Sequence, residues 1–305
     1  MDMRQLTTFR TLATTLSFTQ TAATLNYVQS TVTAQIQALE AELGVQLFDR
    51  LGKRVILTAA GQRLLQYAEK ILSLAEEAQH AVAGEEEPTG TLRLSAPESV
   101  CIYRLPGILR EYHLRCPRVR LLFQPVACID APRMVSSGQV DVALILDKPL
   151  RAVHLWVEAL SAEPILLVAP PEHPLTGVPR VTTADMDGEP VVLTETNCSY
   201  RIAFEQTLTH AGIHPATTLE FSNVEAIKQC VMAGMGLGVL PAYVVDRELE
   251  QRRIAALNWV EADMTMQLQM IWHKDRWLSP ALRAFLEVVR EQLPVMPEPT
   301  VTAWE

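Results

Sequence analysis

The feature that most constrains the fold is a pair of short helix signals separated by a tight turn near the N-terminus. Ser17 and Gln20 have the spacing of a capping box, which predicts a helix beginning near Phe18. The turn "NYV" follows, and Gln29 or Ser30 is expected to begin the next helix. Two short helices joined by so tight a turn indicate a helix-turn-helix, provided that the second helix is amphipathic.

The second of these helices does carry an apolar stripe. Its members fall at i, i+4, i+7 and i+11, and they are Val32, Ile36, Leu39 and Leu43. Gly44 is the expected C-terminal stop. The opposite face holds short, neutral hydrogen-bonding side chains, a surface suited to reading base edges in DNA.

The segment "VQLFDRLGKRVILT" comes next and predicts two short strands around "RLGKR". Arg50, Lys53 and Arg54 then lie near the tip of the hairpin. A basic hairpin tip beside a helix-turn-helix is placed to contact phosphates, so this segment is a candidate wing.

A long helix is expected from Thr58 to about Ala83. It carries an apolar seam that needs a partner helix, so we expect dimerisation. The seam consists of Leu64, Ala68, Ile71, Ala75, Ala78 and Val82, with Leu65 and Leu72 alongside. The segment "GEEEPTG" breaks the pattern and marks a domain boundary.

The net charge of -9 is unevenly distributed along the 305 residues. Residues 1–67 carry +2, residues 68–87 carry -5, and residues 88–305 carry -6. The acidity therefore lies outside the N-terminal unit, so it does not argue against DNA binding there.

Composition narrows the class of protein further. With 49% hydrophobic residues the chain can form a sizeable core, and its length suits two or three units. No apolar run reaches the roughly 18 residues of a membrane span, and the N-terminus does not resemble a signal peptide. The five cysteines form no CxxC pair. These features favour a cytoplasmic protein with free thiols and no membrane association.

Strand and helix signals alternate after residue 88, which predicts an α/β fold with mostly parallel sheets. The expected strands are "TLRLSA", "VRLLFQPV", "VDVALIL", "EPILLVAP", "PVVLT", "TTLEF" and "LGVLP". The expected helices cover residues 102–115, 130–138, 199–211, 224–233 and 280–292.

The ungapped segment from Ser17 to Gly61 resembles the DNA-binding unit of LysR-type transcriptional regulators. The segments "SSGQVDVALIL" and "VEAIKQCVMAGMGLGVLP" resemble the effector-binding half of that family. The resemblance implies a winged helix-turn-helix, a dimerising linker helix and a two-subdomain α/β effector domain of the periplasmic-binding-protein type. It also implies a homotetramer, a dimer of dimers, on a double-stranded DNA operator, with RNA polymerase as a further candidate partner.

The expected domains follow from this resemblance. They are residues 1–58 for DNA binding, 59–87 for the linker and 88–305 for the effector. Subdomain I comprises about 88–161 and 268–305, and subdomain II about 162–267.

The resemblance also assigns candidate DNA contacts. They are Gln29, Ser30, Thr31, Thr33 and Ala34 on the helix and Arg50, Lys53 and Arg54 on the wing. Many family members have Arg where Ala34 stands here, and Ala cannot form a bidentate contact with guanine. Base preference is therefore expected to depend on Gln29, Ser30 and Thr33.

The resemblance also implies candidate effector contacts, at the N-termini of two facing helices and at adjoining strand ends. They are Ser99, Val100, Cys101, Cys128, Cys198, Ser199, Tyr200, Ser222 and Val224. Helix N-termini attract anions, and Ser99 and Ser199 are expected to face each other across the cleft. Arg104 and Arg201 are expected to add positive field, so we predict a small anionic effector.

Alternative interpretations remain at several positions. Cys198 occupies the place of the reactive cysteine in peroxide-sensing relatives, but Thr207 stands where their resolving cysteine would be, which favours a thiol that only lines the pocket. A rival function is a redox- or small-molecule-sensing module whose N-terminal helices only oligomerise. His210 and His214 fit a solvated pair at a helix end better than a metal site, and "GMGLG" fits a turn. No catalytic motif is found, so we expect no enzyme activity, cofactor or metal.

Overall fold

The computed structural model describes residues 1–51, 54–83, 88–260 and 264–293, without the side chains of several residues in the wing and the linker helix. The chain divides into two compact units, residues 1–86 and 87–305, which are considered separately. Among the described residues, no helix is both long and apolar enough to cross a membrane.

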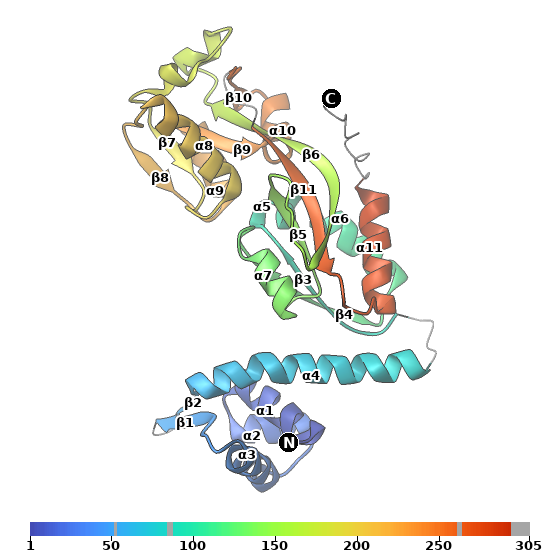
Figure 1. Ribbon diagram of the computed structural model, residues 1–305. Coiled ribbons are helices and arrows are strands. Elements are labelled where there is room, and N and C mark those ends of the chain that lie inside the picture. Colours follow the sequence, from blue (N-terminus) through green and yellow to red (C-terminus); the bar gives the residue numbers. More distant parts are fainter. Residues whose placement is uncertain (52–53, 84–87, 261–263, 294–305) are drawn as a thin grey trace. The chain divides into compact units, whose positions relative to one another are not determined.

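The N-terminal unit is a winged helix-turn-helix (Figure 1). Its elements are α1 (Met3–Thr15), α2 (Phe18–Leu25), α3 (Gln29–Leu43), β1 (Phe48–Leu51), β2 (Arg54–Leu57) and α4 (Ala59–Ala83). The expected starts of α2 and α3 and the antiparallel wing are confirmed.

Local capping sets these boundaries. The Ser17 side chain accepts a hydrogen bond from the Gln20 amide at 3.3 Å and so begins α2, while the reciprocal capping box lies at Asp2 and Gln5 of α1. Asn26 ends α2 in the left-handed conformation with φ of 54°, which Asn tolerates better than most residues. This residue makes the tight turn before α3.

The core of this unit is built where α1, α3, the wing and α4 meet. Its buried apolar side chains are Leu6, Phe9, Leu12, Ile36, Leu39, Leu47, Phe48, Ala68 and Leu72. Glu40 of α3 ties the helix to the wing, because its Oε1 accepts the Leu47 amide at 2.8 Å. The prediction that Leu43 belongs to the buried stripe is wrong, since this side chain is 40% exposed.

The linker helix α4 also departs from the prediction. Ala68 and Leu72 are buried in the core of their own unit, and Leu64, Leu65 and Ile71 pack against it. The first half of the seam therefore has its partner helix within the same chain, because α1 packs on it. The side chain of Val82 lies outside the described residues.

The C-terminal unit has two lobes joined by two antiparallel strands (Figure 1). Lobe I has the parallel strands β3 (Gly90–Ala96), β4 (Val119–Pro125) and β5 (Val142–Asp147). Lobe II has the parallel strands β7 (Val191–Leu193), β8 (Thr218–Glu220) and β9 (Leu237–Pro241). Between them lie β6 (Leu155–Ala169) and β11 (Thr265–His273), in the order β4-β3-β5-β11-β6-β9-β7-β8.

Helices cover the sheets of both lobes. Lobe I carries α5 (Glu98–Tyr103), α6 (Leu105–Arg115), α7 (Ala131–Ser137) and α11 (Pro280–Gln292). Lobe II carries α8 (Ser199–Ala211), α9 (Val224–Met232), α10 (Ala242–Glu250) and the short strand β10 (Ala255–Ala256), which pairs with β6. One continuous apolar core extends through both lobes.

Several elements differ from the prediction. The helix expected over 102–115 begins four residues earlier and is interrupted at Arg104, because Pro106 in the next turn lacks the amide that would continue the first helix. The strand expected at "EPILLVAP" is only the second half of β6. Neither α10 nor β11 was expected. By contrast, Gly212 ends α8 with φ of 71°, as the helix-end interpretation of His210 and His214 requires.

Candidate DNA-reading surface and effector pocket

The N-terminal half of α3 presents the predicted DNA-reading residues. Gln29, Ser30 and Ala34 are exposed, and Thr31 and Thr33 are half-buried. The Thr33 hydroxyl donates to the Gln29 carbonyl oxygen at 3.0 Å, so its methyl group is the part left for a base.

Gln29 is held by a neighbouring helix. Thr19 of α2 donates its hydroxyl to Gln29 Oε1 at 3.3 Å, which leaves the amide nitrogen as the outward donor. Val28, which precedes α3, supplies no side-chain cap and is 65% exposed. Val28 and the exposed Tyr27 lie directly before the helix and were not among the predicted contacts.

Two of the three basic residues predicted at the wing lie on its described strands. Arg50 lies in β1 opposite Val55, and Arg54 begins β2 opposite Leu51. Lys53 lies outside the described residues.

The C-terminal unit contains a pocket of about 340 Å³ between its lobes. It lies at the carboxyl ends of the parallel strands of both lobes, where α/β proteins commonly bind ligands. Its volume falls in the range of small-molecule sites. Six of the nine predicted effector residues line it, namely Ser99, Cys128, Cys198, Tyr200, Ser222 and Val224.

The other three predicted residues do not line the pocket. Val100 is fully buried in the core, and the Cys101 thiol points back to donate to the Pro97 carbonyl oxygen at 3.0 Å. Ser199 is the first residue of α8, and its side chain is half-buried outside the lining.

Sequence reasoning missed the residues that fix the polarity of the pocket. The missed polar lining residues are Glu98, Thr194, Glu195 and Asn197, and the missed apolar ones are Pro97, Pro125, Val126, Ala127 and Leu146. Most of these directly follow β3, β4 or β7. Extending the expected strands by two or three residues would have found them, because the carboxyl ends of parallel strands meet at one edge of a sheet.

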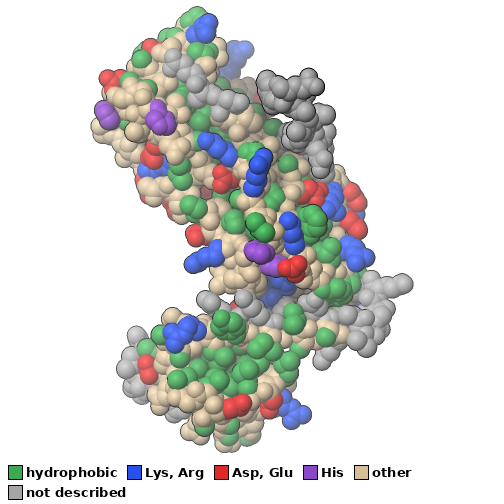
Figure 2. Space-filling view, in the orientation of Figure 1, with side chains coloured by type: hydrophobic (Ala, Val, Ile, Leu, Met, Phe, Trp, Pro, Cys, Tyr) green, Lys and Arg blue, Asp and Glu red, His purple; other side chains and the backbone are tan. Residues whose placement is uncertain are grey.

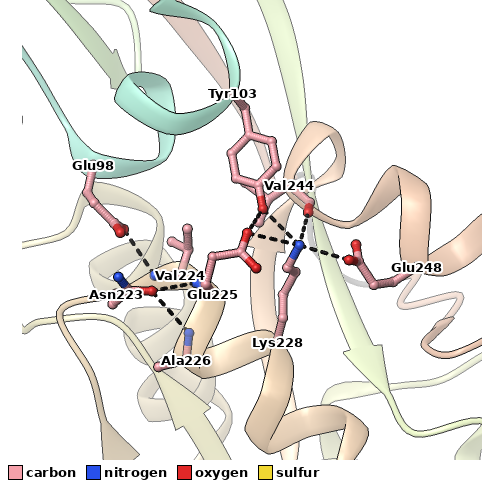
Figure 3. Close-up of polar contacts among 9 residues, drawn as sticks. All are labelled: Glu98, Tyr103, Asn223, Val224, Glu225, Ala226, Lys228, Val244 and Glu248. Carbon is pink, nitrogen blue, oxygen red and sulfur yellow. Dashed lines mark hydrogen bonds and ion pairs between the residues drawn. The ribbon is translucent and has the colours of Figure 1, made fainter. Parts of the chain in front are cut away.

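Helix α5 joins lobe I to lobe II at the edge of the pocket. A Glu98 carboxylate oxygen accepts the Val224 amide of α9 at 3.0 Å, and Tyr243 of α10 donates to the Ser99 hydroxyl at 3.0 Å. Asn223 caps the next two amides of α9, so the first turn of that helix is satisfied within the chain (Figure 3). The α9 N-terminus is therefore not an open anion site.

A buried lysine completes this contact between lobes. Lys228 of α9 is 3% exposed and its ammonium lies 2.8 Å from the Tyr103 hydroxyl of α5 (Figure 3). The same ammonium donates to Glu248 of α10 at 3.0 Å and pairs with Glu225 at 3.0 Å. Tyr103 also donates to Glu225, so lobe I is tied to a charge cluster of lobe II.

The prediction that Arg104 and Arg201 supply positive field to the cleft is wrong. Arg104 Nη2 donates to both carboxylate oxygens of Glu163, at 3.0 Å to Oε1 and 2.9 Å to Oε2. Arg201 pairs with Glu205 at 2.8 Å and Glu220 at 2.6 Å. Neither arginine lines the pocket. Each guanidinium group is already paired with the carboxylates just named.

In the part of the chain that the structure describes, no Lys, Arg or His side chain forms an ion pair with Glu98 or Glu195, the two carboxylates at the pocket. Burial raises the pKa of Glu98, and the negative charges of Glu225 and Glu195 raise it further, while the hydrogen bond from the Val224 amide opposes them. Carboxylates whose pKa is raised by burial and by like charges cluster at functional sites, and Glu98 is a candidate because it also lines the pocket.

The thiols at the pocket are not activated. Burial raises the pKa of Cys198, and it raises the pKa of Cys128 to about 12. Both thiols are therefore protonated at neutral pH and are poor nucleophiles. Among the described residues no three His, Cys, Asp or Glu side chains are grouped as metal ligands.

Comparison with known proteins gives the family. A family model described as the LysR substrate binding domain matches residues 85–294, and one described as bacterial regulatory helix-turn-helix protein, lysR family, matches residues 3–62. The chain is also 45% identical over 292 residues to the HTH-type transcriptional regulator YwqM of Bacillus subtilis (strain 168), covering 95% of this chain and 99% of the relative. The chain belongs to the LysR family. It is a DNA-binding transcriptional regulator with an effector-binding domain, and its relatives are regulators rather than enzymes.

Solved LysR-family structures share this fold. A full-length OxyR variant from Pseudomonas aeruginosa superposes with a TM-score of 0.75 at 22% identity and covers 98% of both chains. Full-length CbnR in complex with its target DNA gives 0.66 at 24% identity and covers 96% of this chain and 100% of its own. The regulatory domain of Synechocystis CcmR, in complex with 2-PG, gives 0.61 at 20% identity and covers 68% of this chain and 100% of its own.

Proposed function

We propose that this LysR regulator reads its operator with α3 and the wing and binds a small effector in the pocket between the two lobes. The observation that carries the proposal is the position of the pocket, which takes residues from strand ends of both lobes and borders the hydrogen bonds between them. A ligand there contacts both lobes at once, so it favours one arrangement of the lobes over another.

Operator reading depends on the short polar face of α3. The Gln29 amide suits adenine, and the methyl groups of Thr33 and Ala34 suit the methyl group of thymine. Ser30 and Thr31 add hydroxyl donors, and Arg50, Lys53 and Arg54 on the wing contact phosphates. The complex of CbnR with its target DNA supports this role for the unit.

Self-association uses apolar surface that the fold leaves exposed. Figure 2 shows many apolar side chains on the drawn face of the N-terminal unit. Among the exposed apolar residues, Met3 is 46% exposed in α1, and Tyr67 and Leu74 are 63% and 67% exposed in α4. A surface of this kind marks a protein interface. The dimer then uses this side of α4 in place of the buried seam, and two dimers form the tetramer. Contact with RNA polymerase remains a prediction.

An anionic effector, which the sequence predicted, is not part of this proposal. The predicted anion depended on two arginines that are already paired and on helix N-termini, of which that of α9 is satisfied within the chain. A reactive Cys198 is not proposed either, because its buried thiol holds its proton.

The test is selection of operator sequences from random double-stranded DNA by the full chain, followed by fluorescence anisotropy. We expect specific sites to bind at least roughly 10³-fold more tightly than random DNA, with strong salt dependence. The variant Ala127→Trp, which fills the pocket, should bind DNA but lose its response to effector. Binding without sequence preference would instead support the rival function, a sensing module whose N-terminal helices only oligomerise.

A further inference from the structure

The pocket is acidic, which the sequence did not suggest. Glu98 and Glu195 line it, and no Lys or Arg is among the described lining residues. The Glu195 side chain is exposed, whereas Glu98 is half-buried beside the contact between lobes. One carboxylate oxygen of Glu98 accepts the Val224 amide, and in the part of the chain that the structure describes the other makes no hydrogen bond.

The nearby cations cannot neutralise these carboxylates, because each is already paired. Lys228 is held by Glu248 and Glu225, Arg201 by Glu205 and Glu220, and Arg104 by Glu163. Among the described residues of the unit, no Lys or Arg side chain therefore pairs with the carboxylates of the pocket.

A second observation is independent of these charges. Thr194 lines the pocket and is only 8% exposed, and among the described residues its hydroxyl oxygen has no hydrogen-bond partner of good geometry. The Cys198 thiol and Tyr200 lie close to it, but a buried hydroxyl without a well-formed hydrogen bond is rare in folded proteins. A polar group of a bound ligand would supply the missing bond.

We propose that the pocket takes a small ligand with a protonated amine, which pairs with Glu98 and Glu195 and donates to the Thr194 hydroxyl. This inference rests on the proposed function, since it assigns a chemical class to the ligand of the same pocket. The apolar residues Pro125, Val126 and Leu146 then contact the carbon skeleton of the ligand. A purely anionic ligand would approach two carboxylates with no countercharge in the lining.

Glu98 would also couple binding to the arrangement of the lobes. Its carboxylate accepts the first amide of α9, so a cation on the same carboxylate acts directly on a hydrogen bond between the lobes. The raised pKa of Glu98 fits this role, because an ammonium group would offset the burial and the repulsion that raise it.

The experiment is calorimetric titration of the full chain with three ligands: pentane-1,5-diamine, L-lysine, which adds a carboxylate to that diamine, and the five-carbon anion pentanoate. We expect both amines to bind and pentanoate not to. Glu98→Gln and Glu195→Gln should each weaken amine binding by roughly tenfold or more, since a hydrogen bond to a charged group is lost. Glu172→Gln, an exposed residue outside the pocket, is the matched control and should bind as wild type.

The outcomes separate this inference from the proposed function. Pentanoate binding that Ala127→Trp abolishes would keep the effector pocket and overturn the amine. Amine binding that is indifferent to both carboxylate variants would also overturn it. Amine binding unaffected by Ala127→Trp would overturn both, because the ligand would then lie elsewhere. Thermal unfolding of each variant confirms that it is folded, and Glu98→Gln retains an acceptor for the Val224 amide.

Discussion

The DNA-reading face of α3 and the effector pocket differ in how they are assembled. The α3 face comes from one short run of sequence, and its residues are neutral and exposed or half-buried. The pocket takes residues from segments of both lobes, and its charge depends on which carboxylates the surrounding arginines and lysine have already paired. The first surface is thus a property of a helix, and the second is a property of the folded unit.

The largest effect expected from this difference concerns the buried charge cluster. Lys228→Met should destabilise the C-terminal unit by about 3–5 kcal/mol, because Glu248 and Glu225 would lose their countercharge. Chemical denaturation of the full chain measures the change, and the exposed Lys148→Met is the matched control. Sequence-selective DNA binding below the transition should persist. If the free energy of unfolding fell by only a few tenths of a kcal/mol, the stability of the C-terminal unit would not depend on this cluster.

A smaller effect is expected at the exposed apolar surface of the N-terminal unit, which we propose as the dimer interface. Leu74→Glu should weaken dimerisation by about a hundredfold, because a charge would enter an apolar interface. Sedimentation equilibrium measures the dimer constant. Ile71→Ala, at a half-buried position packed on the core, should lower stability with less effect on association. An unchanged dimer in Leu74→Glu would place the interface elsewhere.

Gln29→Ala tests whether the α3 face contributes to DNA binding without affecting the effector pocket. It should weaken specific DNA binding by roughly 1–3 kcal/mol and relax preference at one or two base pairs. Arg54→Ala should weaken all sequences alike and reduce the salt dependence. Anisotropy titrations at several salt concentrations separate the two, and effector affinity should not change in either. The reverse assignment would show that the wing reads bases.

The smallest expected effect is a pH dependence at the pocket. The folded chain holds the Glu98 proton more strongly than the unfolded chain does, so its contribution favours folding at low pH and is lost as pH rises through the raised pKa. Without ligand, Glu98→Gln should therefore melt about 1–2 °C higher than wild type at pH 8 and at the same temperature near pH 4. A variant that melts lower at pH 8 would mean that the carboxylate is already compensated.

Sequence alone was sufficient where the deciding interaction is local. The starts of α2 and α3 follow from Ser17 and from the "NYV" turn, both within a few residues. The pocket thiols and hydroxyls came from the resemblance to the family. The charge of the pocket could not be predicted, because the partners of Arg104 and Arg201 are supplied by β6 and β8. The first half of the linker seam was misassigned for the same reason, since it packs within the core that α1 shares.

The path of the chain through β6 and β11 has a consequence for how this unit can be divided. The chain enters lobe II along β6 and returns along β11, and Pro164 pairs with Thr265 in the register of these two strands. Everything between those residues is thus a single insertion whose two ends are neighbours. A short turn joining them would close lobe I without lobe II, which makes the second lobe an exchangeable cassette. Hybrid regulators that keep one DNA-reading unit and one lobe I while changing half of the pocket could be made by exchanging this one segment at its two adjacent junctions.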